Sequence, residues 1–324
     1  MNENQQTQLK NALEAVGKRE IHQVYFAACG GSKAIFEPVQ YIFDVESAIP
    51  CAVYTSNEFI HRAPKALGKN SLFVSCSHSG NTPETVAATA FARKSGALTI
   101  SLSFKEDSEL WNAAEYGISY TWGPGSNPAE SNNAILYRLI FGVLNTLAPD
   151  EKYTRAIQCV DALETLLPEN QDLWQSKAQA YGKAYRKEPL IYTMSSGACY
   201  GVAYSFAICL LMEMQWIHSN AIHSGEYFHG PFEATDEDVP FIILVNSGAT
   251  RPLDIRAVDF ATKYSKRVEV IDAETFKMDG IDEDLRGYFA PLVANAILRR
   301  YADALADFRG HPLSVRRYMW RMEY

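Results

Sequence analysis

The stretch "NSLFVSCSHSGNTPETVAATAFARKSG", residues 70–96, indicates the fold class of this chain. Its first part, 70–76, is a short apolar run typical of a buried strand, and its last part, 83–96, is typical of a helix. A strand that leads directly into a helix is the building block of a parallel sheet covered on both faces. The corner between them holds six short or polar residues, 77–82, although a corner needs only one or two turn formers. We therefore expect this corner to have a function.

The same arrangement of strand, corner and helix occurs twice. "VYFAACGGSKA" from Val24 resembles "IYTMSSGACYG" from Ile191, an offset of 167 residues. "LFVSCSHSGNT" from Leu72 resembles "FIILVNSGATR" from Phe241, an offset of 169 residues, and a third pair, "ALTISLSF" and "RVEVIDAE", follows at nearly the same shift. Three matched pairs in one order indicate an internal repeat.

The two halves predict two α/β domains, each a doubly wound, flavodoxin-like parallel sheet. Short runs rich in Val, Ile, Leu and Phe alternate with helical stretches in both halves, the pattern of a sheet covered by helices on both faces. The 324 residues also exceed the roughly 250 to 300 at which a single core stops growing. We expect an N-terminal helix at 1–20, a first domain at 21–150, connecting helices at 151–185, a second domain at 186–310 and a C-terminal tail at 311–324.

Composition limits the classes of function. The net charge of −8 argues against a nucleic-acid scaffold, and the polar N-terminus lacks the apolar core of a signal peptide. The longest apolar run, "AYSFAICLLMEMQWI", is interrupted by Glu213 and Gln215 and falls short of the roughly 20 residues that span a bilayer. The six cysteines form no CxxC pair, which predicts free thiols in a reducing compartment. We expect a cytoplasmic protein that binds neither membranes nor nucleic acids.

Two corners in the first half carry hydroxyl groups. "CGGS" ends one strand with Ser32, and "SHSGNT" ends another with Ser77, Ser79 and Thr82. In doubly wound sheets, ligands bind beyond the carboxyl ends of the strands. The hydroxyls, together with the free N–H groups of two helix starts, could hold a dianion such as a sugar phosphate. The candidate residues of this site are Gly31, Ser32, Ser77, His78, Ser79 and Thr82.

Helix capping is the alternative explanation for these hydroxyls. Serine and threonine are favoured at helix N-caps, but each helix needs only one, so capping accounts for Ser32 more easily than for the cluster at 77–82. Neither corner has the GK[ST] ending of a Walker A loop or the GxGxxG pattern of a dinucleotide site. Nucleotides are therefore not the expected ligands.

The segment "LLMEMQWIHSNAIHSGEYFHGPFE", residues 210–233, holds the candidates for acid–base chemistry. Glu213 stands in an apolar helical run, where shielding from water suits a carboxylate to be a general base; a partnered structural carboxylate is the alternative. His229 stands in a loop, where histidines more often meet ligands. His218 would lie about 140° around the helix from Glu213, so we expect it to point elsewhere. The spacing of His218, His223 and His229 predicts no metal site.

These motifs resemble the sugar isomerase (SIS) domain, of which the isomerase half of glucosamine-6-phosphate synthase is a double copy. The resemblance covers nearly the whole chain. It implies that Ser32, Ser77, Ser79 and Thr82 hold a substrate phosphate. It also implies that Glu213, which precedes His229 by 16 residues as in that family, moves a proton between sugar C1 and C2. The histidine in "HGP" opens the sugar ring there.

The resemblance implies a dimer and a second acidic candidate. In the family, the histidine reaches the active site from the neighbouring subunit, so we expect a homodimer or higher homo-oligomer with active sites at the interface. Glu226, in "SGEYFHGP", also matches the motif. The family's catalytic lysine near the C-terminus is missing, because the tail "HPLSVRRYMWRMEY" offers Arg316 and Arg317 instead. Arginine stays protonated, so it can bind anions but cannot form a Schiff base.

The segment around Glu213 and the ending "RRYMWRMEY" look most like the fructosamine deglycases of the SIS family. Members of that group hydrolyse 6-phosphorylated Amadori compounds to glucose 6-phosphate and an amino acid, without a metal or organic cofactor. Two other functions stay open. An aldose-ketose or aminosugar-phosphate isomerase would share the phosphate site and the base, whereas a sugar-phosphate sensor would need neither Glu213 nor His229.

Overall fold

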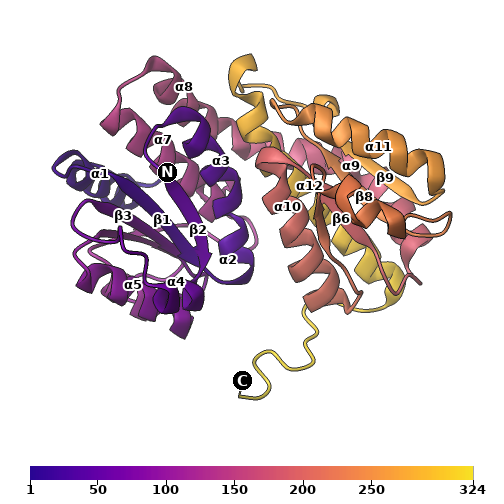
Figure 1. Cartoon of the computed structure of the whole chain (residues 1–324), viewed down its shortest axis with the longest axis horizontal. Helices are drawn as coiled ribbons and strands as arrows, with labels where there is room; N and C mark the ends of the chain where they lie inside the picture. The colour runs from indigo at the N-terminus through magenta and orange to yellow at the C-terminus, as the bar shows by residue number, and fades with distance from the viewer. Residues whose placement is uncertain (324) are drawn as a thin grey trace. The chain divides into compact units, whose positions relative to one another are not determined.

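The chain has two compact units in the computed structural model, which describes residues 1–323 (Figure 1). The first unit comprises Met1–Glu164 with Gly280–Asp282, and the second comprises Thr165–Asp279 with Glu283–Tyr324. Each unit is built around one parallel β-sheet.

The first sheet has five parallel strands in the order β2-β1-β3-β4-β5. The strands are β1 (Gln23–Ala28), β2 (Cys51–Thr55), β3 (Ser71–Cys76), β4 (Leu98–Ser103) and β5 (Tyr116–Ser119). This is the flavodoxin-like order, in which the chain changes direction between β1 and β3. Ala28 pairs with Cys76, so β1 and β3 end side by side and their corners are neighbours. The predicted fold class is confirmed.

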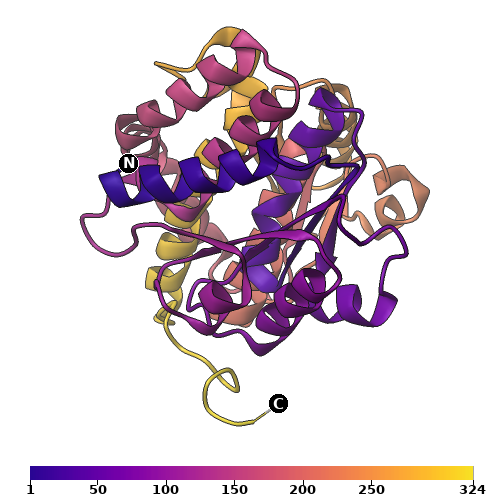
Figure 2. The ribbon, with the colours of Figure 1, turned by 90° about the vertical axis from the view of Figure 1, so that its left-hand side faces the viewer.

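Helices cover both faces of the first sheet (Figure 2). They are α1 (Glu3–Gly17), α2 (Gly30–Ala34), α3 (Phe36–Glu46), α4 (Ser56–Arg62), α5 (Pro83–Lys94), α6 (Glu109–Ala113), α7 (Asn132–Leu147) and α8 (Glu151–Cys159). Alternate residues of β1 face opposite sides: Phe26 packs on Phe36 of α3, with 5.2 Å between ring centroids, and Tyr25 packs on Phe59 of α4, at 5.4 Å. This alternation fixes the position of β1 between two apolar layers.

The second sheet repeats the first four positions in the order β7-β6-β8-β9. Its strands are β6 (Tyr192–Ser195), β7 (Ala221–His223), β8 (Phe241–Val245) and β9 (Val268–Asp272). The main helices are α9 (Leu163–Tyr185), α10 (Tyr200–Ser205), η4 (Phe206–Met214), α11 (Arg251–Tyr264) and α12 (Arg286–Arg309). Short helical turns lie between them: η3 (Gly197–Cys199), η5 (Tyr227–His229) and η6 (Pro231–Ala234).

The element η4 is a π-helix that continues α10 for nine residues. π-Helical segments are rare and occur frequently at functional sites. Within residues 1–323, the stretch Gly197–Met214 that contains η4 is long and apolar enough to cross a membrane by length and hydropathy alone, which differs from our sequence-based prediction. Core helices of α/β domains meet the same criteria, and α10 packs on β6 and α12.

The six cysteines are free, as predicted. Four are buried, namely Cys76, Cys159, Cys199 and Cys209, whereas Cys29 and Cys51 are half-buried. Burial raises the pKa of the Cys76 thiol to about 12. A thiol that stays protonated is a poor nucleophile, so Cys76 has a packing role at the end of β3.

Candidate active site

The corner after β3 brings three of the predicted hydroxyls together. Ser77 is buried directly beyond the strand, and its Oγ lies 2.7 Å from Oγ1 of Thr82, the residue before α5. Ser79 is exposed between them, and its Oγ accepts a hydrogen bond of 3.2 Å from the N–H of Asn81. The side chains of Ser77 and Thr82 therefore hold the turn together, and the side chain of Ser79 is accessible to solvent.

These hydroxyls do not cap the adjacent helices. Thr82 is the N-cap residue of α5 and Cys29 that of α2, and neither makes a side-chain capping hydrogen bond. Ser32 is the third residue of α2, and its hydroxyl acts against the burial that raises the pKa of the Cys76 thiol at the end of β3. The residues before α2 and α5 thus make no capping hydrogen bond through their side chains, and Ser32 lies at a corner next to that of Ser77 and Thr82.

Gly80 fixes the path of this corner. Its φ of +73° lies in the left-handed region, and its carbonyl accepts a 2.8 Å hydrogen bond from the N–H of Leu110. A Cβ atom at this position would lie 2.1 Å from Oγ and 2.3 Å from Cβ of Ser108. Only glycine fits both the backbone conformation and the space.

We expect Gly80→Ala to lower the free energy of unfolding by about 2 to 4 kcal/mol, because the left-handed backbone and the overlap with Ser108 both oppose a methyl group. Gly30→Ala is the matched control. Its φ of +54° carries the same backbone penalty, but no atom lies within 4 Å of the added Cβ. Denaturant unfolding of both variants separates the two causes, and equal losses would show that Ser108 imposes no steric limit.

His78, another candidate of this corner, is part of an aromatic cluster. Its Nδ1 lies 3.0 Å from the hydroxyl of Tyr120, and its ring contacts Phe104 and Trp122 at centroid distances of 5.7 and 4.8 Å. Desolvation by these rings lowers the pKa of His78. The contact with Tyr120 thus connects the corner to this aromatic cluster. Gly31, at the neighbouring corner, is exposed.

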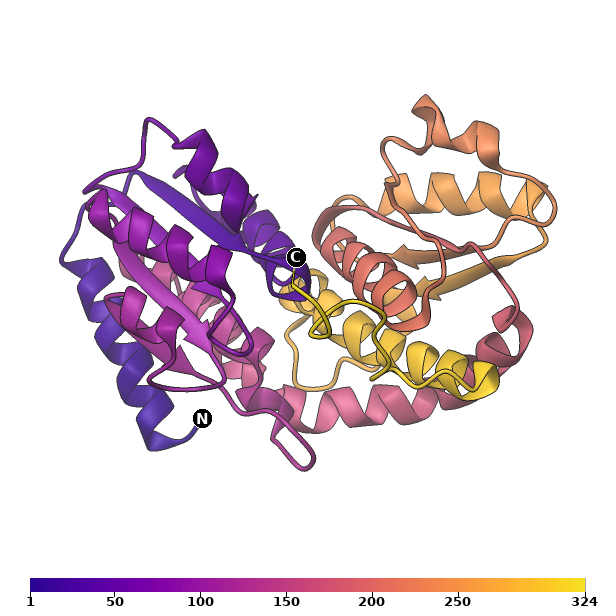
Figure 3. The ribbon, with the colours of Figure 1, turned by 90° about the horizontal axis from the view of Figure 1, so that it is seen from below.

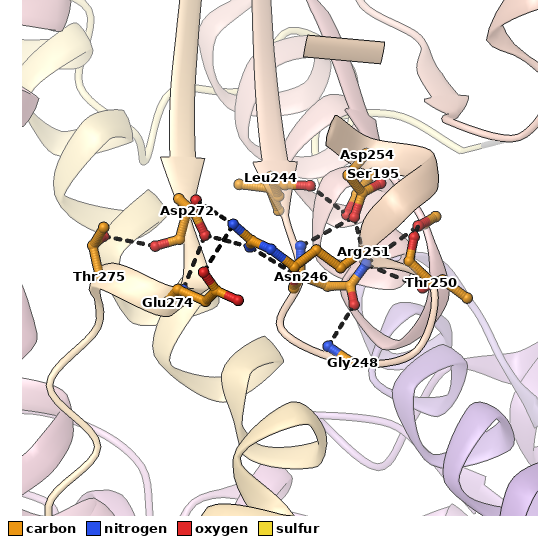
Figure 4. Close-up of polar contacts among 11 residues, drawn as sticks. Ser195, Leu244, Asn246, Gly248, Thr250, Arg251, Asp254, Asp272, Glu274 and Thr275 are labelled. Carbon is orange, nitrogen blue, oxygen red and sulfur yellow. Dashed lines mark hydrogen bonds and ion pairs between the residues drawn. The ribbon is translucent and has the colours of Figure 1, made fainter. Parts of the chain in front are cut away.

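The corresponding corner of the second unit is filled by its own side chains (Figure 4). Asp254, in the first turn of α11, is fully buried and accepts hydrogen bonds from the hydroxyl of Ser224 at 2.6 Å and from the N–H of Asn246 at 3.0 Å. The Asn246 amide also donates to Thr250 Oγ1 at 3.0 Å. Arg251 is paired with Asp272 through two contacts of 2.6 and 2.8 Å.

The two corners differ in charge at equivalent positions. In the first unit, Ser56 after β2 hydrogen-bonds the hydroxyl of Thr85 in α5 at 3.0 Å. In the second unit, Ser224 after β7 hydrogen-bonds the carboxylate of Asp254 in α11. Burial raises the pKa of Asp254, and the hydrogen bonds from Ser224 and Asn246 act against that rise. A carboxyl group at the strand ends disfavours a bound anion, so the corner of the first unit is more favourable for an anion than that of the second.

Glu213 is the next-to-last residue of η4 and is held by the C-terminal tail. Its Oε1 lies 2.8 Å from Nη2 of Arg316, and the Glu213 side chain is 24% exposed whereas that of Arg316 is 8% exposed. Nη1 of Arg316 donates to the carbonyls of Leu313 and Val315. Glu213 therefore has a cationic partner, not only the apolar surroundings expected from the sequence.

The first part of the tail, the yellow C-terminal segment in Figure 3, contacts the end of η4 through Arg316. The amide of Gln215 donates a 2.7 Å hydrogen bond to the carbonyl of His311, and the rings of Trp216 and His311 are 4.5 Å apart. Arg309 also donates to the Gln215 carbonyl at 3.2 Å. These contacts position the first part of the tail beside Glu213.

A cavity of about 590 Å³ opens between η4 and the tail. This volume lies within the range of about 300 to 1,000 Å³ that is usual for small-molecule sites. The lining residues are Met212, Glu213, Trp216, Ile217, His218, Arg316, Arg317, Tyr318 and Met319. The carboxylate, imidazole and guanidinium groups among them, those of Glu213, His218, Arg316 and Arg317, could face a substrate.

His218 corrects our sequence-based interpretation. The helix ends at Met214, so the helical rotation that separated His218 from Glu213 does not apply. His218 instead pairs with Leu190 in an isolated β-bridge and lines the same cavity as Glu213. The helical periodicity of the sequence does not indicate that His218 lies at the cavity, because the position of His218 depends on where the π-helix ends.

His229 and Glu226 lie outside this cavity in the part of the chain that the structure describes. Both are exposed at the short turn η5, where the N–H of His229 donates to the carbonyl of Glu226 at 2.9 Å. Across residues 1–323, no three His, Cys, Asp or Glu side chains form a group that could hold a metal ion. Glu213 and Arg316 form an ion pair, whereas His229 does not line their cavity.

The chain is similar to known proteins over nearly its whole length. The SIS domain model matches residues 19–142. The chain is 51% identical to fructosamine deglycase FrlB of Bacillus subtilis, over 96% of this chain and 95% of that protein, and 27% identical to fructoselysine 6-phosphate deglycase of Escherichia coli, over 94% and 88%. A crystal structure from Bacillus subtilis named as a phosphosugar isomerase superposes with a TM-score of 0.96, at 50% identity and over 98% and 97% of the two chains.

A doubly wound parallel sheet with a hydroxyl-rich corner after β3 is consistent with the SIS family, whose domain model matches residues 19–142. The identity and coverage reported above are specific enough for a narrower assignment. The chain belongs to the SIS-domain family and, within it, to the fructosamine deglycases. It is thus an enzyme.

Proposed function

We propose that this protein hydrolyses 6-phosphorylated Amadori compounds, fructose-amino acid 6-phosphates, to glucose 6-phosphate and a free amino acid. The observation that carries the proposal is Glu213, a carboxylate that lines a cavity of small-molecule size in a chain related to fructosamine deglycases. The hydroxyls at 77–82 support it as well, because a corner whose hydroxyls do not cap a helix suits a phosphate.

The reaction is a proton transfer followed by hydrolysis. An Amadori compound has its amine on C1 and its carbonyl on C2. Removal of a C1 proton, with protonation of the C2 oxygen, gives an enaminol. Protonation of the enaminol at C2, as the nitrogen lone pair forms the C1–N double bond, and loss of the N–H proton give a C1 imine that keeps the C2 hydroxyl. Water adds to this imine and releases the amine, so that a C–N bond is hydrolysed.

Two side chains have the chemistry for these steps. Glu213 is the base that takes the C1 proton and returns it at C2, and His229 is the acid near the ring oxygen or O2. Arg316 is a positioning residue, because its guanidinium contacts the Glu213 carboxylate at 2.8 Å while two tail carbonyls hold the same group. The route uses no metal or organic cofactor.

Release of glucose 6-phosphate from a panel of phosphorylated fructose-amino acids tests the proposal. We expect the pure protein to convert at least one member and to release one amino acid per glucose 6-phosphate. Interconversion of fructose 6-phosphate and glucose 6-phosphate, without turnover of any panel member, would support an isomerase instead and overturn the proposal.

We expect Ser79→Ala and Thr82→Ala each to raise KM by roughly 10- to 100-fold, because each removes a hydrogen bond to a charged phosphate worth about 1.5 to 3 kcal/mol. Ser95→Ala is the matched control, since its hydroxyl bonds the Phe91 carbonyl at the other end of α5. Steady-state kinetics check the result. Unchanged KM in both variants, or equal turnover of the dephosphorylated substrate, would remove the phosphate from this corner.

A cytoplasmic location and a homodimer with active sites at its interface stay predictions. Both accompany the proposed function: free cysteines suit a reducing compartment, and a histidine outside the cavity of its own chain suits an interface site. Size-exclusion chromatography with light scattering would measure the mass of the assembly.

A further inference from the structure

Arg317 lines the cavity beside Glu213 and has no assigned role in the reaction. Its guanidinium carbon lies 4.3 Å from the centroid of the Trp216 ring, and the side chain is exposed. Trp216 has a φ of +55°, which is unusual for a bulky residue and occurs mainly where the surrounding structure imposes it. The chain thus bends sharply at the residue that supports Arg317.

The charged groups around the cavity leave the guanidinium of Arg317 available to bind an anion. Arg316 is occupied by Glu213 and by two backbone carbonyls of the tail. Within residues 1–323, no carboxylate forms an ion pair with Arg317. The pair of Glu213 and Arg316 is neutral as a whole. The cavity therefore has a net positive charge, which comes from Arg317. A guanidinium stacked on an aromatic ring retains N–H groups for a carboxylate.

The other walls of the cavity are largely apolar. Met212, Trp216 and Tyr318 are 44%, 39% and 61% exposed, which is high for such side chains. Ile217 and Met319 complete the wall. A methionine-rich wall adapts to apolar groups of different shape. The cavity therefore offers one cation, one base and an apolar surface, a combination that matches a carboxylate attached to an apolar group.

We infer, resting on the proposed function, that this cavity holds the amino acid part of the substrate. Arg317 receives the carboxylate, and Met212, Trp216 and Met319 receive the side chain, while Glu213 faces C1, to which the amine is attached. Arg317 is a specificity-determining residue in this arrangement. It favours Amadori compounds of amino acids with uncharged, apolar side chains and disfavours a cationic group close to the carboxylate.

The test compares two substrates that differ only in the carboxylate: the Amadori 6-phosphate of leucine and that of leucinamide. We expect wild-type kcat/KM to be roughly 10- to 100-fold higher for the acid, the factor that a hydrogen bond to a charged group supplies. Arg317→Gln should lower kcat/KM of the acid to that of the amide and leave the amide unchanged. Arg317→Lys should restore part of the preference.

Arg321→Gln is the matched control, because Arg321 is an exposed arginine of the same tail that does not line the cavity. It should keep the wild-type preference. Wild-type turnover of both substrates at the same kcat/KM would overturn the inference and leave the deglycase activity standing. An equal loss on both substrates in Arg317→Gln would also overturn it, since Arg317 would then serve the phosphate or the fold. Failure of the wild type on every panel member would overturn the proposed function first.

Discussion

Glu213→Gln is expected to lower kcat for deglycation by roughly 10²- to 10⁴-fold, the range typical of a lost general base. Glutamine keeps the shape of the side chain and can still accept a hydrogen bond from Arg316, which lies 2.8 Å from the Glu213 carboxylate. Binding of glucose 6-phosphate should therefore change little. Glucose 6-phosphate release and calorimetric binding of the product measure the two quantities separately.

Glu226→Gln is the control for this variant. Glu226 is exposed at the turn η5 and does not line the cavity, so we expect nearly wild-type kcat. Full activity in Glu213→Gln together with a large loss in Glu226→Gln would move the base to Glu226. Exchange of the C1 proton with solvent deuterium gives an independent check, because it requires the base but not the hydrolysis of the imine.

The fold could be predicted from short stretches of sequence because its determinants are local. Each apolar run of the matched pairs forms a strand, and each polar corner follows the strand that precedes it. The pairing of β1 with β3 then places Ser32 near Ser77, since neighbouring parallel strands end at one edge of the sheet. The hydroxyl-rich corner needs only this topology and its own residues, 77–82.

The surroundings of Glu213 could not be predicted in the same way. Arg316 reaches Glu213 only because the tail turns back after α12, and no local pattern encodes that path. The π-helix ends at Met214 and places His218 at the cavity, where an α-helical period predicted the opposite. The two corners have similar sequences but differ in charge. The carboxylate of Asp254, in α11, occupies the corner of the second unit.

Mixing two inactive variants is expected to restore activity. Glu213→Gln lacks the proposed base and His229→Asn lacks the proposed acid, so each homodimer should be nearly inactive. The resemblance to the SIS family implies that each active site takes its histidine from the partner subunit, and His229 lies outside the cavity that contains Glu213 of its own chain. A heterodimer would then have one site with a wild-type glutamate and a wild-type histidine.

Subunit exchange at equal concentrations makes half of the dimers mixed, with one intact site of two, so activity should recover to about a quarter of wild type. Native mass spectrometry measures the fraction of heterodimers in the sample whose glucose 6-phosphate release is assayed. Mixing Glu213→Gln with the double variant Glu213→Gln, His229→Asn is the control, and it must stay inactive because no wild-type glutamate is present. If confirmed heterodimers of the two single variants also stay inactive, both residues act within one subunit. The exposed His229 would then reach the cavity of its own chain by a movement of the segment around η5, and the interface would not be needed for the chemistry.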